Sequence, residues 1–225
     1  MNNLFYDGFN SKLIETAMFE SILEIPVIKP PEKIIIPKRA IPFSKIKEIS
    51  DPYDMLVFYE HDPIFRDFIS VPQKYDKLLS KVRIMSTPDA SLYRDMPLWE
   101  QLANIGVSRS VGYYEQQKGK YVIPNVRWGD ERTYTTKLFN IPPSFAGIPK
   151  NSIISIGTYG CSKTKEDKFY LSDFMKHMID YLQPSDVIVY GSLSQQIKQQ
   201  FGSHTNFHVF PDWISYKKGG QDGHK

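Results

Sequence analysis

From residue 51 onward, short runs of apolar residues alternate with longer stretches in which apolar positions recur every three or four residues. Runs such as "MLVFYEH" (Met55–His61) and "DVIVYG" (Asp186–Gly191) contain few polar residues, which is typical of strands buried on both faces of a parallel sheet. The pattern predicts six strands, at residues 55–61, 81–87, 120–128, 152–160, 186–191 and 206–213.

Helical spacing fills most of the gaps between these runs. Asp95 is positioned to cap the longest helical segment, which would end near Gly119, and Pro184 would stop a second one. The alternation predicts an α/β fold, a mostly parallel sheet of about six strands with covering helices, and it fits an open sheet as well as a partial or complete barrel. The predicted helical segments are residues 63–80, 98–119, 167–184 and 192–202.

The first fifty residues follow a different pattern. Residues 10–24 predict a short amphipathic helix, and five prolines between residues 26 and 42 then exclude a helix and favour an extended chain. Because this stretch also contains many Ile and Val residues, we predict a Pro-rich arm that lies across the main domain or a partner. The predicted organisation is a helix and arm at residues 1–50, an α/β domain at 51–214 and a flexible tail at 215–225.

Composition narrows the class of protein. With 41% hydrophobic and 14% aromatic residues in 225, the chain can bury a sizeable core and is not disordered over most of its length. The formal net charge is only +3, so charge alone gives no sign of a nucleic-acid surface. Cys161 is the single cysteine, which excludes an internal disulfide. The sequence shows neither a secretory signal nor a membrane-spanning run, so we expect a soluble, cytoplasmic protein.

Polar residues collect where the predicted strands end. In parallel α/β folds, ligands bind beyond the carboxyl ends of the strands, so we expect the ligand-binding residues at this edge. Strand ends also need caps and turns, and a purely structural explanation therefore stays open for each residue. The candidate ligand-binding residues are Asn125, Arg127, Trp128, Gly157, Thr158, Gly160, Ser192 and Asp212.

Two of the strand-end carboxylates are candidates for catalysis. Asp89 and Asp130 would face each other from adjacent strand ends and could transfer protons, although each could equally form a turn or cap a helix. Arg127 has a guanidinium suited to a phosphate or carboxylate, or to a structural pair with Asp130. Trp128 could stack on a base. The connection at residues 129–150 lacks a helical pattern, and a loop of that length is often functional.

The stretch "GTYGCSKT", residues 157–164, resembles a phosphate-binding P-loop, but Ser162 replaces the second glycine that the motif requires. The magnesium-binding Asp of such enzymes is missing too, because "DVIVYG" ends in Tyr and Gly. An anion-binding turn and a flexible loop both remain compatible with this stretch. The histidines do not have metal-ligand spacing, so no metal site is predicted and the identity of any cofactor stays open.

Four segments carry a resemblance to a known family: "PDASLY", "IPNVRWGD", "SIGTYGC" and "VYGS". Together they resemble an uncharacterised family of bacteria, phages and other mobile elements, domain of unknown function 4417, over roughly residues 51–213. The resemblance implies no established activity. It implies a bacterial cell or phage-infected host as the setting, and a role in mobile-element biology.

These observations leave two main hypotheses for function. The first is an enzyme that acts on a nucleotide, a phosphate-bearing small molecule or a nucleic-acid end, with Arg127 as anion ligand. The alternative is a non-catalytic DNA- or protein-binding module that uses the basic and apolar arm at residues 25–49. A scaffold derived from an enzyme that has lost its catalysis is a third possibility. The oligomeric state stays open.

Overall fold

The computed structural model describes residues 10–158 and 164–222, with side chains of the last helix described as far as residue 218. The described strands are β1 (Phe19–Glu20), β2 (Ile25–Pro26), β3 (Arg39–Pro42), β4 (Asp54–Val57), β5 (Ile84–Ser86), β6 (Tyr121–Ile123), β7 (Ile153–Gly157), β8 (Asp186–Tyr190) and β9 (Asn206–Phe210). The α-helices are α1 (Arg66–Ser70), α2 (Leu98–Gln117), α3 (Glu131–Tyr134), α4 (Lys165–Leu182), α5 (Gln195–Phe201) and α6 (Trp213–Asp222). The 3₁₀-helices of the described residues are η1 (Ser11–Ile14), η2 (Phe43–Glu48), η3 (Asp62–Ile64), η4 (Pro72–Tyr75), η5 (Leu78–Lys81) and η6 (Pro143–Phe145).

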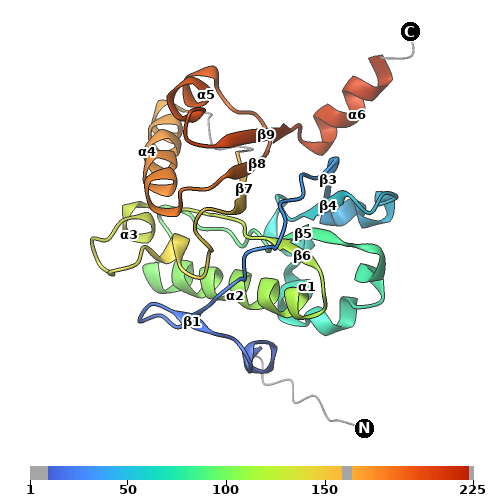
Figure 1. Ribbon diagram of the computed structural model, residues 1–225, viewed down its shortest axis with the longest axis horizontal. Coiled ribbons are helices and arrows are strands. Elements are labelled where there is room, and N and C mark those ends of the chain that lie inside the picture. The colour runs from blue at the N-terminus through green and yellow to red at the C-terminus, as the bar shows by residue number, and fades with distance from the viewer. Residues whose placement is uncertain (1–9, 159–163, 223–225) are drawn as a thin grey trace.

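Two parallel sheets form the body of the molecule, β3-β4-β5-β6 and β7-β8-β9 (Figure 1). They meet just beyond β6, where the Val126 N–H donates to the Ser155 carbonyl at 2.8 Å and the Ser155 N–H donates to the Pro124 carbonyl at 2.9 Å. Pro124 has no N–H of its own, so pairing with β7 begins only at this point. Within each sheet, every strand lies parallel to its successor in the chain, and the parallel bridge between Asn125 and Ser155 continues this order from one sheet to the other.

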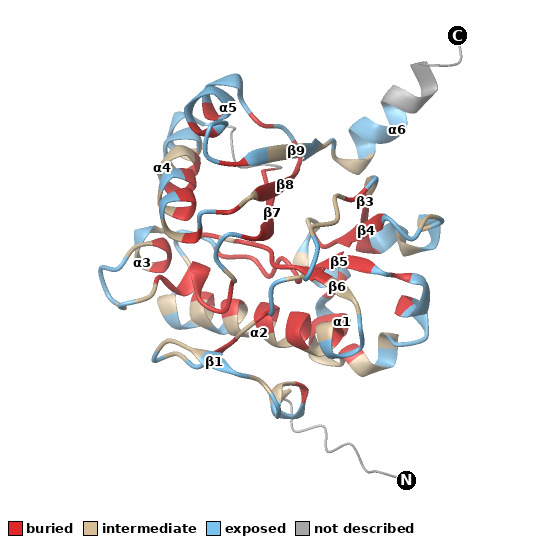
Figure 2. Cartoon of the chain, viewed as in Figure 1, coloured by how far each residue is buried: buried red, intermediate tan, exposed pale blue. Residues whose placement is uncertain are grey.

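The mostly parallel α/β class is therefore confirmed, but one sheet of about six strands is not what forms. Side chains alternate between the two faces of the strands. One face of both sheets contributes to a shared apolar cluster that includes Met55, Ile84, Ile123 and Ile188. The other face packs under helices, so that β4, β5, β7 and β8 are buried on both sides, whereas β9 is partly exposed and the helices expose their outer faces (Figure 2). This explains the continuous apolar runs in the sequence.

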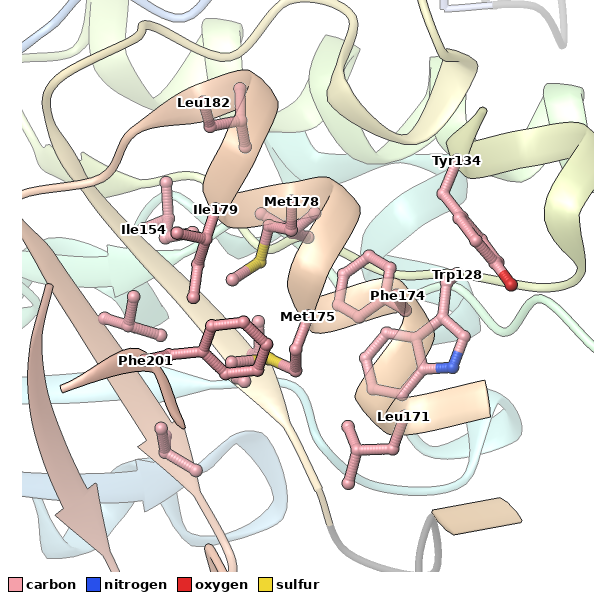
Figure 3. Packing of buried hydrophobic residues seen from close by; sticks show 14 of the residues in the cluster. Trp128, Tyr134, Ile154, Leu171, Phe174, Met175, Met178, Ile179, Leu182 and Phe201 are labelled. Atoms are coloured by element: carbon pink, nitrogen blue, oxygen red, sulfur yellow. The ribbon is translucent and has the colours of Figure 1, made fainter. Parts of the chain in front are cut away.

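Helix α4 shows how the apolar spacing positions one of these covers. Phe174, Met175 and Met178 lie fully buried on one face of the helix and pack into the cluster drawn in Figure 3. The Phe174 ring stacks on Trp128 with centroids 4.1 Å apart and planes 17° from parallel. Burial of each such side chain contributes roughly 1.5–3 kcal/mol, so α4 is held firmly against the segment that follows β6.

The N-terminal helix predicted over residues 10–24 is reduced to the single turn of η1. The chain then forms the hairpin of β1 and β2, with Ser21 and Glu24 at positive φ of 66° and 51° in its turn. Ile25 of β2 is only 4% exposed and packs in a small cluster with Ile105 of α2. Tertiary burial of Ile25 outweighs the weak local helix preference.

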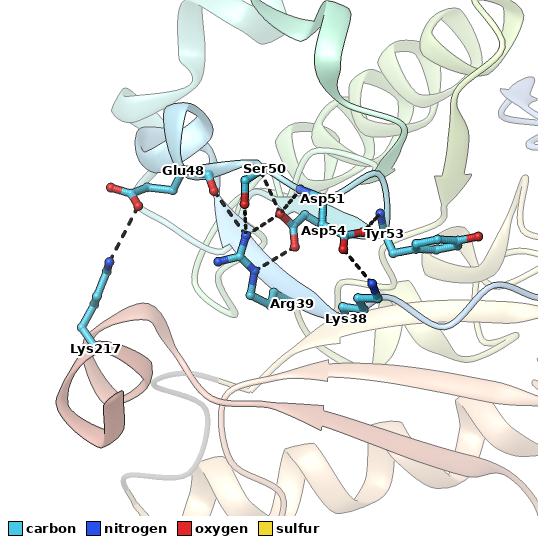
Figure 4. Close-up of polar contacts among 8 residues, drawn as sticks. All are labelled: Lys38, Arg39, Glu48, Ser50, Asp51, Tyr53, Asp54 and Lys217. Atoms are coloured by element: carbon cyan, nitrogen blue, oxygen red, sulfur yellow. Dashed lines mark hydrogen bonds and ion pairs between the residues drawn. The ribbon is translucent and has the colours of Figure 1, made fainter. Parts of the chain in front are cut away.

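Residues 25–49 do not form an arm set apart from the body. Within them, β3 pairs along its length with β4, and Ile28, Ile41 and Phe43 are buried. Arg39 of β3 is fastened to the buried Asp54 of β4 by two hydrogen bonds of 2.8 and 2.5 Å (Figure 4). The predicted boundary at residue 50 therefore falls inside the four-stranded sheet. The lysines of this segment stay exposed, but one edge of its strand is already used within the chain.

The longer helical predictions are confirmed by α2, α4 and α5, with small shifts at their ends. Asp95 does not cap α2; Pro97 stands at that position without a side-chain cap. The segment at 63–80 forms several short turns around α1, and the segment at 129–150 contains α3 and η6. Most of the predicted tail lies in α6. Within residues 10–158 and 164–222, none of the helices has the length and apolarity that crossing a bilayer requires.

Candidate functional site

A cleft of about 460 Å³ opens beyond the carboxyl ends of β4, β5, β6 and β7. Its floor includes Tyr59, Asp89, Arg127 and Gly157, which come from four consecutive strand ends. Its outer part includes residues of the β5–α2 connection and of the first turns of α4. The volume lies within the range of small-molecule sites, roughly 300–1,000 Å³. The parallel order of the strands brings these side chains to one edge.

A chain of polar contacts crosses the floor of the cleft. The Tyr59 hydroxyl donates to Asn125 Oδ1 at 3.0 Å, and Asn125 Nδ2 donates to Asp89 Oδ1 at 2.7 Å. The other oxygen of Asp89 lies 3.5 Å from Arg127 Nη1. Asp89 needs donors and Tyr59 needs an acceptor, so these neighbours fix the orientation of the Asn125 amide between them.

Burial sets the electrostatics of this floor. Asp89 is 6% exposed, and its burial raises the pKa of the carboxyl above the usual value, although Arg127 and the Asn125 amide act in the opposite direction. Burial also raises the pKa of the Tyr59 hydroxyl well above 10, with the charge of Asp89 adding to the effect. Tyr59 is therefore a neutral hydrogen-bond donor here, while Asp89 is the group that can change its protonation.

Arg109 of α2 supports the floor from behind. Its guanidinium is buried and donates to the main-chain carbonyls of Asn125 at 2.9 Å, Ser144 at 3.1 Å and Ala146 at 3.2 Å. Burial lowers the pKa of Arg109 to about 10. These contacts tie the end of β6 to the segment around η6, so the position of Asn125 is set by α2 as well as by the sheet.

Arg94 links two elements at the rim of the cleft. Arg94, from the β5–α2 connection, contacts Glu166 and Asp167 in the first turn of α4, each at 3.1 Å. Its guanidinium also lies over the Tyr170 ring, 4.6 Å from the centroid. Tyr93 beside it is 55% exposed. The rim thus combines a cation, two carboxylates and two aromatic rings.

Several residues predicted from the sequence come together here. Asp89, Arg127, Trp128 and Gly157 all line the cleft, and Asn125 bonds to Asp89 just behind it. Gly157 is needed because a Cβ at this position would lie 2.3 Å from the Tyr59 ring. Arg127 pairs with Asp89, and not with Asp130 as the sequence also allowed. Trp128 is only 8% exposed, with Phe174 stacked on its ring and the Arg127 guanidinium 5.8 Å from the ring centroid.

Other predicted residues serve as caps and turns. Asp130 does not line the cleft with Asp89; it caps α3 and bonds to Arg132 at 2.9 and 2.7 Å. Asp212 accepts from the Ser215 hydroxyl at 2.7 Å in the first turn of α6. Thr158 donates to the Ser192 carbonyl at 2.7 Å and so links the ends of β7 and β8. The expected pair of catalytic carboxylates is therefore not assembled.

The glycine-rich stretch lies partly outside the described residues, and Gly160 is among those left out. Where the description resumes, the Thr164 hydroxyl accepts from the Asp167 N–H and the Asp167 carboxylate accepts from the Thr164 N–H, both at 3.0 Å. This capping box takes up two of the donors with which a helix N-terminus would hold phosphate. Among the described residues, no three His, Cys, Asp or Glu side chains gather as a metal site.

Most residues of the cleft were not among the sequence candidates, and those that matter most for its chemistry are Tyr59, Arg94, Asp167 and Tyr170. Arg94 follows a predicted strand, so its position was a usable signal. Tyr59 looked like an ordinary apolar strand residue, and only its inward direction brings the hydroxyl to Asn125. Asp167 and Tyr170 lie on a helix, and nothing in the helical spacing indicates which face borders a cleft.

The fold and the cleft define a class: an α/β protein with parallel strands in chain order and a polar cleft at their carboxyl ends. The chain belongs to the family described as domain of unknown function (DUF4417), whose model matches residues 17–211. It is 32% identical over 138 residues to the "Gene 1 protein" of Mycobacterium phage L5, and 30% identical over 138 residues to the "Gene 1 protein" of Mycobacterium phage D29.

Each of these two alignments covers 61% of this chain, but only 57% of the L5 protein and 48% of the D29 protein. The chain therefore matches about half the length of these phage relatives. No solved structure shows a significant match to the chain.

Proposed function

We propose that this chain binds a phosphate-bearing small molecule, nucleotide or nucleic-acid end in the cleft, and that Asp89 acts on it as an acid–base group. The observation that supports this most is the buried Asp89 carboxylate, held between the Asn125 amide and Arg127 at the floor of a ligand-sized cleft. Strand ends that only needed capping would not require a carboxylate in such a place, because burying it is costly.

The residues at the cleft have chemically distinct parts in this proposal. The raised pKa of Asp89 brings its proton exchange closer to neutral pH, which suits a proton-transfer group. Arg127 and Arg94 are cations at the floor and at the rim, and both can bind an anionic group. Asn125 orients Asp89 and does not itself need to contact the ligand.

The relatives support a setting for this activity. Both similar proteins come from phages, so a function exercised in a phage-infected cell is part of the proposal. Nucleotides and nucleic-acid ends are abundant there. The name "Gene 1 protein" states no activity, so these relatives support only the phage setting.

The proposal is tested by thermal-shift measurements with nucleoside monophosphates and sugar phosphates. A ligand at about a hundred times its Kd should stabilise the wild-type protein by about 2.7 kcal/mol, which raises Tm by several degrees. Arg127→Gln and Asp89→Asn should remove most of this shift. Arg132→Gln is the matched control, because Arg132 bonds to Asp130 and does not line the cleft.

Circular dichroism should first show that each variant is folded. The proposal is wrong if no phosphate-bearing ligand shifts Tm, or if the shift is the same in Arg127→Gln and Asp89→Asn as in the wild type. A shift lost equally in Arg132→Gln would place binding elsewhere on the protein.

A further inference from the structure

The cleft contains carboxylates as well as guanidinium groups, and this limits the ligands it can hold. Its ionisable side chains include three carboxylates, Glu60, Asp89 and Asp167, against two guanidinium groups, Arg94 and Arg127. Like charges brought together in a poorly solvated site are costly. A polyphosphate would place several negative charges beside these carboxylates, so the cleft as a whole does not suit one.

The floor offers a neutral pattern of hydrogen bonding. The Asp89 carboxylate accepts and the Arg127 guanidinium donates, side by side, with 3.5 Å between Oδ2 and Nη1. A phosphate bound to Arg127 would have to displace Asp89 from it or lie against that carboxylate. A planar group with a donor next to an acceptor, as in a cyclic amide or a nucleobase edge, meets both without a net change in charge.

One aromatic ring of the floor can contact a flat ligand. Trp128 lines the cleft but is only 8% exposed, with Phe174 stacked on its ring and the Arg127 guanidinium 5.8 Å from the ring centroid, so Tyr59 is the more exposed of the two rings. Tyr59 is fixed by its stack on Tyr190, with centroids 5.3 Å apart and planes 20° from parallel. A rigid aromatic ring binds a planar group at little entropic cost.

The rim offers a cation that a ligand can capture. Arg94 is 37% exposed at its side chain; of its two carboxylate partners, Glu166 is 68% exposed and Asp167 is 23% exposed. An ion pair as exposed as the one with Glu166 contributes little to stability, so an incoming anion can replace Glu166 at low cost while Asp167 stays in place. A bidentate contact between the guanidinium and one phosphate is the stronger of the two alternatives.

We infer that the cleft takes a nucleobase-bearing ligand with one phosphate, its base edge on Asp89 and Arg127 and its phosphate on Arg94. This inference rests on the proposed function and names its ligand class as a nucleoside monophosphate, free or at the end of a nucleic-acid strand. In this assignment, Asp89 and Arg127 at the floor select the base, and Arg94 at the rim binds the phosphate.

Isothermal titration calorimetry with the full chain tests this assignment, using the four ribonucleosides, their 5′-monophosphates and triphosphates, ribose 5-phosphate and inorganic phosphate. At least one nucleoside should bind without any phosphate, and its 5′-phosphate should tighten binding about tenfold or more. Arg94→Gln should remove that gain and leave the nucleoside affinity unchanged. Asp89→Asn should weaken the nucleoside itself by about tenfold or more, and Arg132→Gln should change neither.

Two results would overturn the inference. In the first, ribose 5-phosphate or inorganic phosphate binds as tightly as the best monophosphate, and Arg127→Gln abolishes this binding. The phosphate would then lie at the floor, so the proposed function would stand but the assignment of base and phosphate would be wrong. A triphosphate that binds at least tenfold more tightly than the monophosphate would likewise refute the charge argument. If none of these probes binds, the proposed function fails together with the inference.

Discussion

The Asp89 side chain is held between groups that act on its protonation in opposite directions. Arg127 and the Asn125 amide favour the ionised form, while burial disfavours it, and burial has the larger effect on its pKa. A carboxylate in this position lowers the free energy of unfolding when it is ionised. Binding and catalytic groups are commonly retained at such a cost to stability.

The pH dependence of stability should expose this cost. Because the folded pKa of Asp89 is raised above its unfolded value of 3.8, the cost is absent at lower pH and appears as pH rises through the folded pKa. Asp89→Asn should therefore be more stable than the wild type near pH 7. The difference should shrink toward pH 4 in urea unfolding measured at several pH values. A variant that is less stable at every pH would contradict this account.

Gly157 allows the Tyr59 ring to approach β7. A Cβ at Gly157 would lie 2.3 Å from the ring, so Gly157→Ala should cost about 1–3 kcal/mol and displace Tyr59. Gly106, by contrast, lies inside α2, and a Cβ added there would meet only Ile25, at an ordinary contact distance of 3.8 Å. Gly106→Ala should therefore raise stability by about 0.5–1 kcal/mol.

A double-mutant cycle with Tyr59→Ala provides the check on this residue pair. If the ring is the obstacle, Gly157→Ala should cost much less once the ring is removed. An unchanged cost in that background would mean that the backbone, and not Tyr59, requires glycine at residue 157.

At the scale of elements, β3 and β4 are joined by a buried network around Asp54, drawn in Figure 4. The Asp54 carboxylate accepts from Arg39, and its Oδ2 also accepts from the main-chain N–H groups of Ser50 and Asp51, both at 3.0 Å. Burial raises the pKa of Asp54, but these donors outweigh it, so the pKa is lowered. The stabilisation is present above the unfolded pKa of 3.8 and is lost as pH falls through the lower folded value.

Asp54→Asn should lower the free energy of unfolding by roughly 3 kcal/mol, since it leaves the charge of Arg39 without its buried partner. Asp51→Asn is the control: Asp51 pairs with the exposed Lys38, and loss of that pair should cost much less than loss of the Asp54 contacts. Urea denaturation at pH 7 compares the two variants. Similar losses for both would show that β3 is not fastened through Asp54.

For the whole molecule, the elements that could be predicted are those whose pattern and burial agree. The apolar stripe of α4 and the continuous runs of β7 and β8 have one interpretation each, because one face or both faces must be buried. The hairpin of β1 and β2 could not be predicted, because its packing depends on Ile105, about eighty residues away. The position of β3 in the sheet likewise depends on its contact with Asp54. The prolines around β3 interrupt the apolar pattern by which a strand is predicted.

The cleft was predictable to the extent that strands form it. Asp89, Arg127 and Gly157 follow or end strands, and a parallel sheet must bring such residues to one edge. The roles of Asp130 and Asp212 could not be separated from those of Asp89, because a carboxylate after a strand looks the same in the sequence whether it caps a helix or faces a cavity. Only the direction of the side chain distinguishes them.

The chain-order pairing of β3 to β9 has a consequence for biosynthesis. Each strand finds its neighbour among residues that have only just left the ribosome or are next to leave it, so the sheet can grow by one strand at a time with short loop closures. Asp89, Asn125 and Arg127 would already be in contact while β8 and β9 are still being translated. The contacts of Asp89 with Asn125 and Arg127 would thus form during translation, before Tyr190 of β8 is present to stack on Tyr59.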